Sequence, residues 1–272
     1  MSQPFDKDLF QKKLTTSWLG REFTHLSKVD STNSYLKKVP AVQLIHGMVV
    51  VADRQEKGRG QHQKEWVANP GENLTFTLAL KPDRAEGLPL LTLSSALAVA
   101  NVLESYAGKP FFLKWPNDIY IEQKKIGGVL TECSFLGSKP EKVLIGIGVN
   151  VNQQTFNENR AGKAVSLSQL SGKTFSREGL LADILNSMEM LFKSWIDREA
   201  SLHRKVSRAM IGFGEWVRLN VDGKFAEGRY KFLGVNEKGE LLVLNEKLEL
   251  NTYSHEQIRI ISGNDSISKM HK

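Results

Sequence analysis

The chain has 272 residues, of which 37 are Lys or Arg and 30 are Asp or Glu, so its formal net charge is +7; 40% of the residues are apolar. This length is enough for one sizeable core and a smaller satellite domain. The composition argues against a disordered chain. No run approaches about eighteen apolar residues and the N-terminus lacks an apolar signal stretch, which argues against a membrane span and a secreted protein.

The single cysteine, Cys133, cannot form an internal disulfide, so we expect a reducing, cytoplasmic environment. We expect its side chain to be a small buried core residue rather than a nucleophile. The excess positive charge lies in residues 1–213, because residues 214–272 contain nine Lys or Arg and nine Asp or Glu. Such a surplus suits an anionic ligand (a phosphate, nucleotide or nucleic acid), although a basic surface also occurs without one.

The first elements follow from capping residues and apolar patterning. A short strand near residue 25 precedes the polar segment 30–33, whose small side chains favour a helix start. We expect a helix over residues 32–38, ended by Pro40. Residues 47–53 have the β-branched run of a buried strand, and residues 54–65 contain no apolar side chain and should form a solvent-facing loop.

The middle of the chain alternates strands with two long helices. Residues 90–106 carry apolar side chains around much of a helical circumference, which predicts a mostly buried helix that ends near Gly108. Residues 180–196 have helical apolar spacing, with Ser176 as a plausible cap. Further strands are expected at 73–80, 111–115, 119–121, 126–133 and 142–151. Because strands and helices alternate irregularly and several strands are hairpin neighbours, an α+β layer with a mainly antiparallel sheet is favoured over a doubly wound parallel sheet.

Residues 214–272 have a different character. Five short strands separated by turn residues, without a helical pattern, predict a small β-barrel. We therefore expect two domains, residues 1–213 and 214–272.

Two motifs that resemble phosphate-binding signatures are incomplete. Residues 171–174 (SGKT) would need a glycine at position 167, which is Leu167, and the pair Gly146 and Gly148 would need a third glycine at Val151. The six histidines show no metal-ligand spacing, so no protein-built metal site is predicted.

The segment Lys57-Gly58-Arg59-Gly60-Gln61 is more informative. Glycines at alternate positions permit unusual dihedral angles and close approach of the backbone to a ligand, with N–H groups available to an anion. Arg59 adds a planar fork suited to phosphate. The alternative is a flexible, solvated loop with incidental charge.

A second basic motif surrounds Lys114, which ends the apolar stretch 111–113 and precedes Trp115-Pro116-Asn117-Asp118. A lysine held there is costly unless it meets an anion; the alternatives are a lysine that reaches solvent or pairs with Asp118. Downstream, Lys125-Ile126-Gly127-Gly128 offers another cation and two positions without side chains, although hairpin glycines explain these equally well.

Taken in order, these stretches resemble biotin–protein ligases over residues 25–152. The matching residues are Ser31-Thr32-Asn33, Gln55, Gly58-Arg59-Gly60, Trp66, Lys114-Trp115-Pro116-Asn117-Asp118, Lys125-Ile126-Gly127-Gly128 and Gly146-Ile147-Gly148-Val149-Asn150. The resemblance implies a catalytic domain like that of class II aminoacyl-tRNA synthetases, of the biotin/lipoate-ligase type, in residues 1–213. An SH3-like barrel in residues 214–272 would follow it.

The resemblance also implies roles for individual residues. Lys114 and Arg59 are implied to be catalytic. Those implied to bind biotin are Ser31, Thr32, Asn33, Gln55, Arg59, Gly60, Gln61, Lys114, Gly127 and Gly128. Those implied to bind ATP or the adenylate are Arg59, Trp66, Lys114, Lys125 and Asn150. The family loop usually carries more cations than this one, which has Gln61, Gln63 and Lys64 where Arg, Gly and Arg are usual.

The implied activity is that of a biotin–[acetyl-CoA-carboxylase] ligase, which forms biotinyl-5′-adenylate from biotin and ATP with Mg²⁺. The biotinyl group is then transferred to a lysine of a biotin carboxyl carrier protein. Homodimerisation is compatible with the family. Because about 24 residues precede the first matching strand, no helix-turn-helix domain is expected, and neither DNA nor membrane binding is expected.

Two other functions fit parts of the sequence. A lipoate–protein ligase would share the fold and the adenylate chemistry, but the glycine–arginine loop and the barrel fit biotin better. A nucleic-acid-binding protein would fit the pI of about 9.3, yet residues 54–64 have no aromatic side chain interleaved with their charges.

Overall fold

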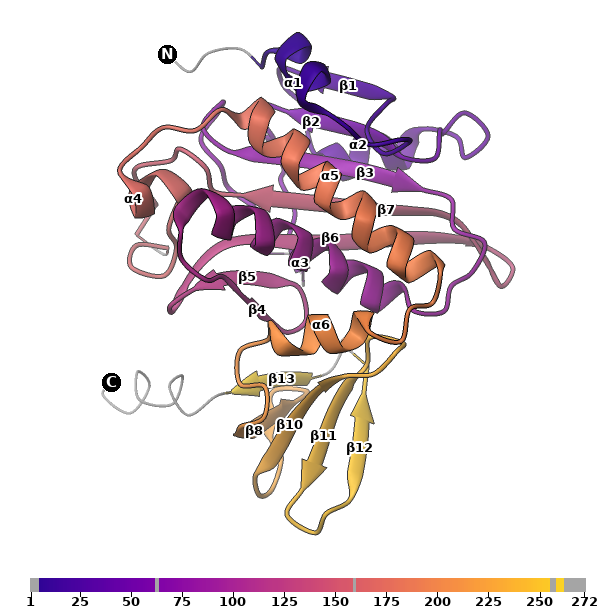
Figure 1. Ribbon diagram of the computed structural model, residues 1–272, viewed down its shortest axis with the longest axis vertical. Coiled ribbons are helices and arrows are strands. Elements are labelled where there is room, and N and C mark those ends of the chain that lie inside the picture. The colour runs from indigo at the N-terminus through magenta and orange to yellow at the C-terminus, as the bar shows by residue number, and fades with distance from the viewer. Residues whose placement is uncertain (1–4, 62–63, 159, 255–257, 262–272) are drawn as a thin grey trace.

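The structure, a computed structural model, describes residues 5–61, 64–158, 160–254 and 258–261 (Figure 1). A seven-stranded sheet has the order β1-β2-β3-β7-β6-β5-β4. Its strands are β1 (Phe23–Leu26), β2 (Met48–Ala52), β3 (Leu74–Leu80), β4 (Phe112–Lys114), β5 (Asp118–Ile121), β6 (Lys124–Leu136) and β7 (Lys139–Val149). Only β1 and β2 pair in parallel, so the predicted α+β class with a mainly antiparallel sheet is confirmed.

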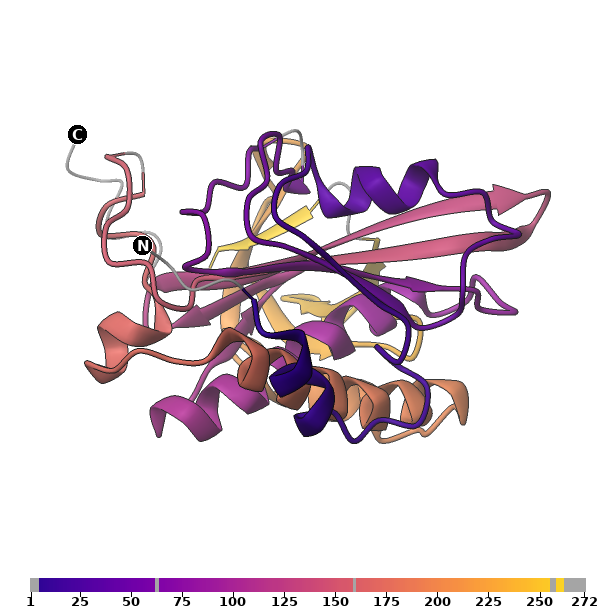
Figure 2. The ribbon, with the colours of Figure 1, turned by 90° about the horizontal axis from the view of Figure 1, so that it is seen from above.

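Helices α1 (Lys7–Lys13), α3 (Leu88–Ala107) and α5 (Arg177–Ile196) cover one face of this sheet (Figure 2). The cap predicted for α5 is confirmed, since Ser176 accepts a hydrogen bond from the N–H of Gly179. By length and composition alone α3 could cross a membrane, but 72% of its apolar window is buried inside the protein. It therefore acts as the central helix of the core.

Helix α2 (Thr32–Lys38) lies on the opposite face of the sheet (Figure 2). Its predicted bounds are confirmed: Ser31 caps it by accepting from the N–H of Ser34 at 3.5 Å, and the helix ends just before Pro40. A small apolar cluster packs beneath it and contains Leu36, Leu44, Val50, Ala79 and Leu144. Because Leu36 is the α2 member, this cluster holds the second half of the helix against β2, β3 and β7.

The second sheet is entirely antiparallel and lies beyond α6 (Leu202–Arg208) (Figure 1). Its strands are β8 (Trp216–Val221), β9 (Lys224–Phe225), β10 (Tyr230–Val235), β11 (Leu241–Asn245), β12 (Leu250–Tyr253) and β13 (Ile258–Ile261). The order is β12-β11-β10-β8-β13, with β9 paired to β8. Among the described residues this sheet has six strands where five were predicted, and β9 has only two residues and pairs with β8. The domain division between residues 213 and 214 remains a prediction.

Two sequence expectations need correction. Cys133 is exposed on β6 rather than buried in the core. The outer part of β6 pairs with β7 alone, so many of its alternating side chains face solvent. Helices α1, α4 (Leu167–Ser171) and α6 were not predicted. Each has five to seven residues, and helices this short depend on tertiary packing rather than on propensity.

Candidate active site

A pocket of about 530 Å³ lies on the α2 side of the large sheet. Twelve of the thirteen predicted site residues line it: Ser31, Thr32, Asn33, Gln55, Arg59, Gly60, Gln61, Trp66, Lys114, Lys125, Gly128 and Asn150. The exception is Gly127. A Cβ atom there would lie 2.7 Å from the backbone oxygen of Gly148, so this glycine serves close strand packing instead.

Two glycines of β7 form a flat part of the pocket wall. A Cβ atom at Gly146 would lie 2.2 Å from Oδ1 of Asn33, and one at Gly148 would lie 2.4 Å from the ring of Trp66. Real Cβ atoms do not approach other heavy atoms this closely. The spacing of Gly146 and Gly148 is therefore explained by two side chains that lie directly on the strand, and not by a dinucleotide fingerprint.

The loop after β2 folds back on itself over the pocket. The N–H of Gly60 donates to the carbonyl of Lys64 at 2.7 Å, and that of Trp66 donates to the carbonyl of Gly58 at 2.9 Å. Neither glycine has a φ in the left-handed region, so the expected unusual dihedral angles are absent here. Glycine is needed at position 58 for space, because a Cβ atom there would lie 2.3 Å from the backbone oxygen of Trp66.

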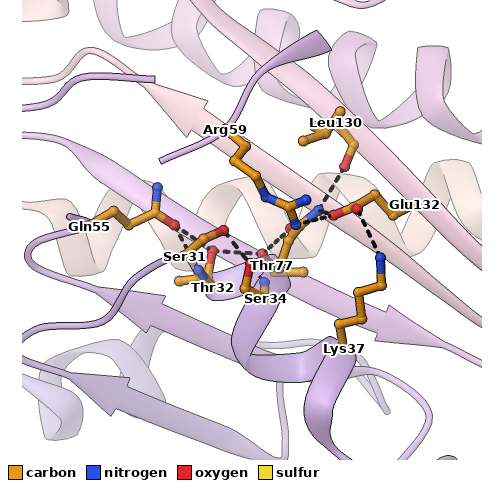
Figure 3. Close-up of polar contacts among 10 residues, drawn as sticks. Ser31, Thr32, Ser34, Lys37, Gln55, Arg59, Thr77, Leu130 and Glu132 are labelled. Atoms are coloured by element: carbon orange, nitrogen blue, oxygen red, sulfur yellow. Dashed lines mark hydrogen bonds and ion pairs between the residues drawn. The ribbon is translucent and has the colours of Figure 1, made fainter. Parts of the chain in front are cut away.

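A chain of hydrogen bonds orders the α2 end of the pocket (Figure 3). Oε1 of Gln55 accepts from the N–H of Thr32 at 2.8 Å and from its hydroxyl at 3.0 Å. Thr77, on β3, lies 2.7 Å from the Thr32 hydroxyl and donates to Oδ1 of Asn33 at 2.5 Å. Because these side chains come from three segments, the network sets the position of the loop relative to α2.

Glu132 on β6 was not predicted, yet it joins the same network (Figure 3). Its Oε2 accepts from Nη2 of Arg59 at 2.7 Å and from Nδ2 of Asn33 at 2.9 Å. Nζ of Lys37 lies 3.7 Å from Oε1. No sequence motif marks Glu132. Only its place on the pocket side of β6, with Gly128 and Leu130, could have suggested a role.

Lysines from the two basic motifs line another part of the pocket. Nζ of Lys114 lies 5.4 Å above the ring of Tyr120, within cation–π distance. Nζ of Lys125 donates to Oδ1 of Asp118 at 2.5 Å. Asp118, one of the alternatives considered for Lys114, is thus engaged by the other lysine.

Three further cations line the pocket, and the sequence analysis missed them: Arg160, Lys163 and Arg259. Arg160 donates to the carbonyls of Glu65 (2.5 Å) and Val67 (3.1 Å) and so fastens the end of the loop. Its guanidinium carbon lies 5.9 Å from the ring centre of Trp66. Arg259 comes from β13, so the second sheet contributes directly to the pocket wall.

Three buried polar atoms of pocket residues have no hydrogen-bond partner within the described part of the chain. They are the indole Nε1 atoms of Trp66 and Trp115 and Oδ1 of Asn150. Nδ2 of Asn150 donates to the carbonyl of Val165 at 3.2 Å, which leaves its oxygen as the available acceptor. Unpaired buried polar groups cost free energy, and a polar ligand would satisfy them.

The pocket is strongly cationic, with seven Lys or Arg side chains and two carboxylates, Glu65 and Asp118, in its lining. Among the described residues no group of three or more His, Cys, Asp or Glu could hold a metal ion. Although the Cys133 side chain reaches solvent, neighbouring atoms desolvate its sulfur in part, and together with the Glu132 carboxylate this raises the pKa of the thiol to about 11. The arrangement suits binding two anions side by side and stabilising negative charge.

Comparison with known proteins is consistent with this geometry. Residues 26–150 match the model of the biotin/lipoate A/B protein ligase family. The bifunctional ligase/repressor BirA of Bacillus spizizenii is 31% identical over 246 residues, covering 89% of this chain and 75% of that protein. The biotin–[acetyl-CoA-carboxylase] ligase of Mycobacterium tuberculosis is 26% identical over 229 residues, with 81% and 83% covered.

Among solved structures, biotin protein ligase from Aquifex aeolicus in complex with biotin and ATP superimposes with a TM-score of 0.76 at 33% identity. The match covers 88% of this chain and 99% of that one. It confirms the class II synthetase-like fold that the family resemblance implied, and the C-terminal barrel.

Proposed function

The chain belongs to the biotin–protein ligase family, and from that premise we propose that it joins biotin to ATP and then transfers the biotinyl group to a lysine of a carrier protein. In the first step the biotin carboxylate attacks the α-phosphorus of ATP, forming biotinyl-5′-adenylate and releasing pyrophosphate. In the second step the lysine amine attacks the acyl carbon of the mixed anhydride. AMP leaves, and an amide remains.

The observation that carries this proposal is the pocket itself. Its seven cations against two carboxylates offset the repulsion between a carboxylate and a triphosphate. Lys114 comes from the strand that ends in the pocket, and we assign to it the charge that develops at the reacting carboxylate and α-phosphate. Neither step needs a covalent enzyme intermediate, so positioning and charge suffice.

The two ends of the pocket suit different substrates. We place biotin at the end formed by Ser31, Thr32, Asn33 and Gln55, where ordered hydroxyl and amide groups complement a neutral polar ring. We place the nucleotide beside Trp66, Lys125 and Asn150. The unpaired Oδ1 of Asn150 is an acceptor that an adenine amino group would satisfy.

Mg²⁺ would enter with the nucleotide, since this ion is commonly held by substrate phosphates, water and one or two carboxylates. The lining offers Asp118 and Glu65 for that purpose, which fits an ion that nucleotide phosphates largely coordinate. When bound, it would neutralise phosphate charge. The carrier is a biotin carboxyl carrier domain. The cytoplasmic location, the absence of DNA binding, the homodimer and the division at residue 213 also remain predictions.

The decisive experiment is biotin-dependent exchange of labelled pyrophosphate into ATP by the purified chain. Exchange with biotin but not lipoate, followed by biotinylation of a carrier domain, is the expected result. Exchange supported by lipoate but not by biotin would show that the chain is a lipoate–protein ligase. Retention on DNA or RNA that weakens with salt, without any exchange, would favour a nucleic-acid-binding protein.

A further inference from the structure

Glu132 occupies a junction that the ligation chemistry described above does not use. Its carboxylate connects three segments: β6, which carries it; α2, through Asn33 and Lys37; and the loop, through Arg59 (Figure 3). It is not among the residues that line the pocket, but Asn33 and Arg59 both are. Glu132 therefore acts on the pocket only through other side chains.

The contact with Asn33 fixes an amide. Nδ2 donates to Glu132 at 2.9 Å, Oδ1 accepts from Thr77, and Gly146 lies directly behind the side chain. Asn33 is 3% exposed. With both ends of its amide engaged, Asn33 has one orientation in the pocket wall.

The contact with Arg59 fixes a guanidinium. The Arg59 side chain is long and 40% exposed, so without a partner for its guanidinium it would sample many rotamers. An ion pair at this exposure adds little to overall stability. Its structural effect is to hold the guanidinium against the sheet at the α2 end of the pocket.

We propose that Glu132 is a positioning residue that keeps Arg59 ordered before biotin binds. This inference rests on the proposed function. Glu132 lowers the ordering cost of engaging the biotin carboxylate and the adenylate phosphate, since Arg59 starts near the site rather than free in solvent. The opposite effect would follow if Glu132 sequestered Arg59 or repelled the anionic substrate, so the direction of the change is informative.

The test is a double-mutant cycle in the pyrophosphate-exchange assay, with Glu132→Gln, Arg59→Gln and the double variant. Glu132→Gln should raise the KM for biotin about tenfold and change kcat by less than about threefold. In the Arg59→Gln background the same substitution should change KM by less than about twofold. Glu141→Gln is the matched control, because it removes a carboxylate from the neighbouring strand β7 that contacts Ser134 and not Arg59, and it should leave both constants unchanged.

Three outcomes would overturn the inference: a lower KM for Glu132→Gln, an equal effect with and without Arg59, or no effect. If Glu132→Gln does not fold, as judged by thermal unfolding, Glu132→Asp retains the charge one methylene further back and enters the same cycle. Failure of the proposed function is recognised separately, because the unmodified chain would then show no biotin-dependent exchange.

Discussion

The two faces of the large sheet are made from the same strands, but one face forms the main apolar core and the other carries the pocket. On β3, Leu74, Phe76, Leu78 and Leu80 belong to the main apolar core, whereas Thr77 joins the polar network under α2. On β7, isoleucines 145 and 147 belong to the core, whereas Gly146 and Gly148 leave room for Asn33 and Trp66. The two-residue period of a strand thus alternates large core side chains with polar or small residues of the pocket wall, and Phe76 and Ile147 border both the core and the pocket.

The largest expected effect on stability comes from the helix-covered face. Leu78 is fully buried and does not line the pocket, so Leu78→Ala should lower the free energy of unfolding by about 2–5 kcal/mol.

Thr77→Val, at the neighbouring position on the pocket side, should lower the free energy of unfolding by about 1–3 kcal/mol and also raise the KM for biotin. Urea unfolding combined with pyrophosphate exchange measures both quantities. If both variants changed only stability, the functional division of the faces would be wrong.

On the pocket side, Lys114→Ala should lower the exchange rate by about 10²–10³-fold, because one electrostatic group at the reacting centre is lost. Stability should change little, since Lys114 is half-buried at a strand end. Lys109→Ala, five residues earlier and exposed, serves as the control. An exchange rate near that of the unmodified chain would remove Lys114 from the reacting centre.

Gly148→Ala tests the close approach of Trp66. The new methyl group would lie 2.4 Å from the indole, so the ring must move, at a cost of about 1–3 kcal/mol. In this variant the KM for ATP should rise more than the KM for biotin does. Gly179→Ala in α5 is the control: its methyl group would lie 3.1 Å from Nζ of the flexible Lys13 side chain and at ordinary contact distance, 3.6 Å, from Oγ of Ser176, so the change should be neutral or stabilising. A KM for ATP that stayed constant would place the nucleotide away from Trp66.

The smallest effect concerns Glu189 of α5, whose carboxylate holds residues 17–19, the segment before β1, against this helix. Desolvation raises the pKa of this carboxyl, but the N–H groups of Leu19, Ser17 and Trp18 outweigh it, so the net pKa is lowered. A lowered pKa in the folded state gives stability at neutral pH that is lost as the pH falls through it. Glu189→Gln should cost about 1 kcal/mol at pH 7. In thermal unfolding the difference should shrink on acidification, and a constant difference would contradict this role.

Elements with strong local signals were predicted well. The helix over 32–38 has a capping serine and a terminating proline, and β2 and β3 have unbroken apolar or alternating runs. The two basic motifs were brought into one pocket because each lies at a strand end or in an adjacent loop. These features depend on neighbouring residues in the chain, which is why sequence patterns reveal them.

The features that were missed depend on contacts between distant segments. Glu132 meets Arg59 across 73 positions, and Arg259 reaches the pocket from the second sheet. The exposure of Cys133 was not predicted, because β5 pairs with β6 only as far as Gly128, whereas β6 continues to Leu136 with β7 as its one partner strand. Gly58 was assigned to unusual dihedral angles, whereas it is needed for the space taken by a carbonyl group eight residues away.

The presence of Arg259 in the pocket wall has a thermodynamic consequence. A ligand that contacts both sheets contributes its binding free energy to holding them together, so occupancy and domain docking are linked equilibria. Amide hydrogens of β13 should then exchange more slowly when the pocket is filled, although that strand makes no backbone pair with the large sheet. Hydrogen exchange in the smaller sheet would in this way measure occupancy of a pocket that lies on the larger sheet.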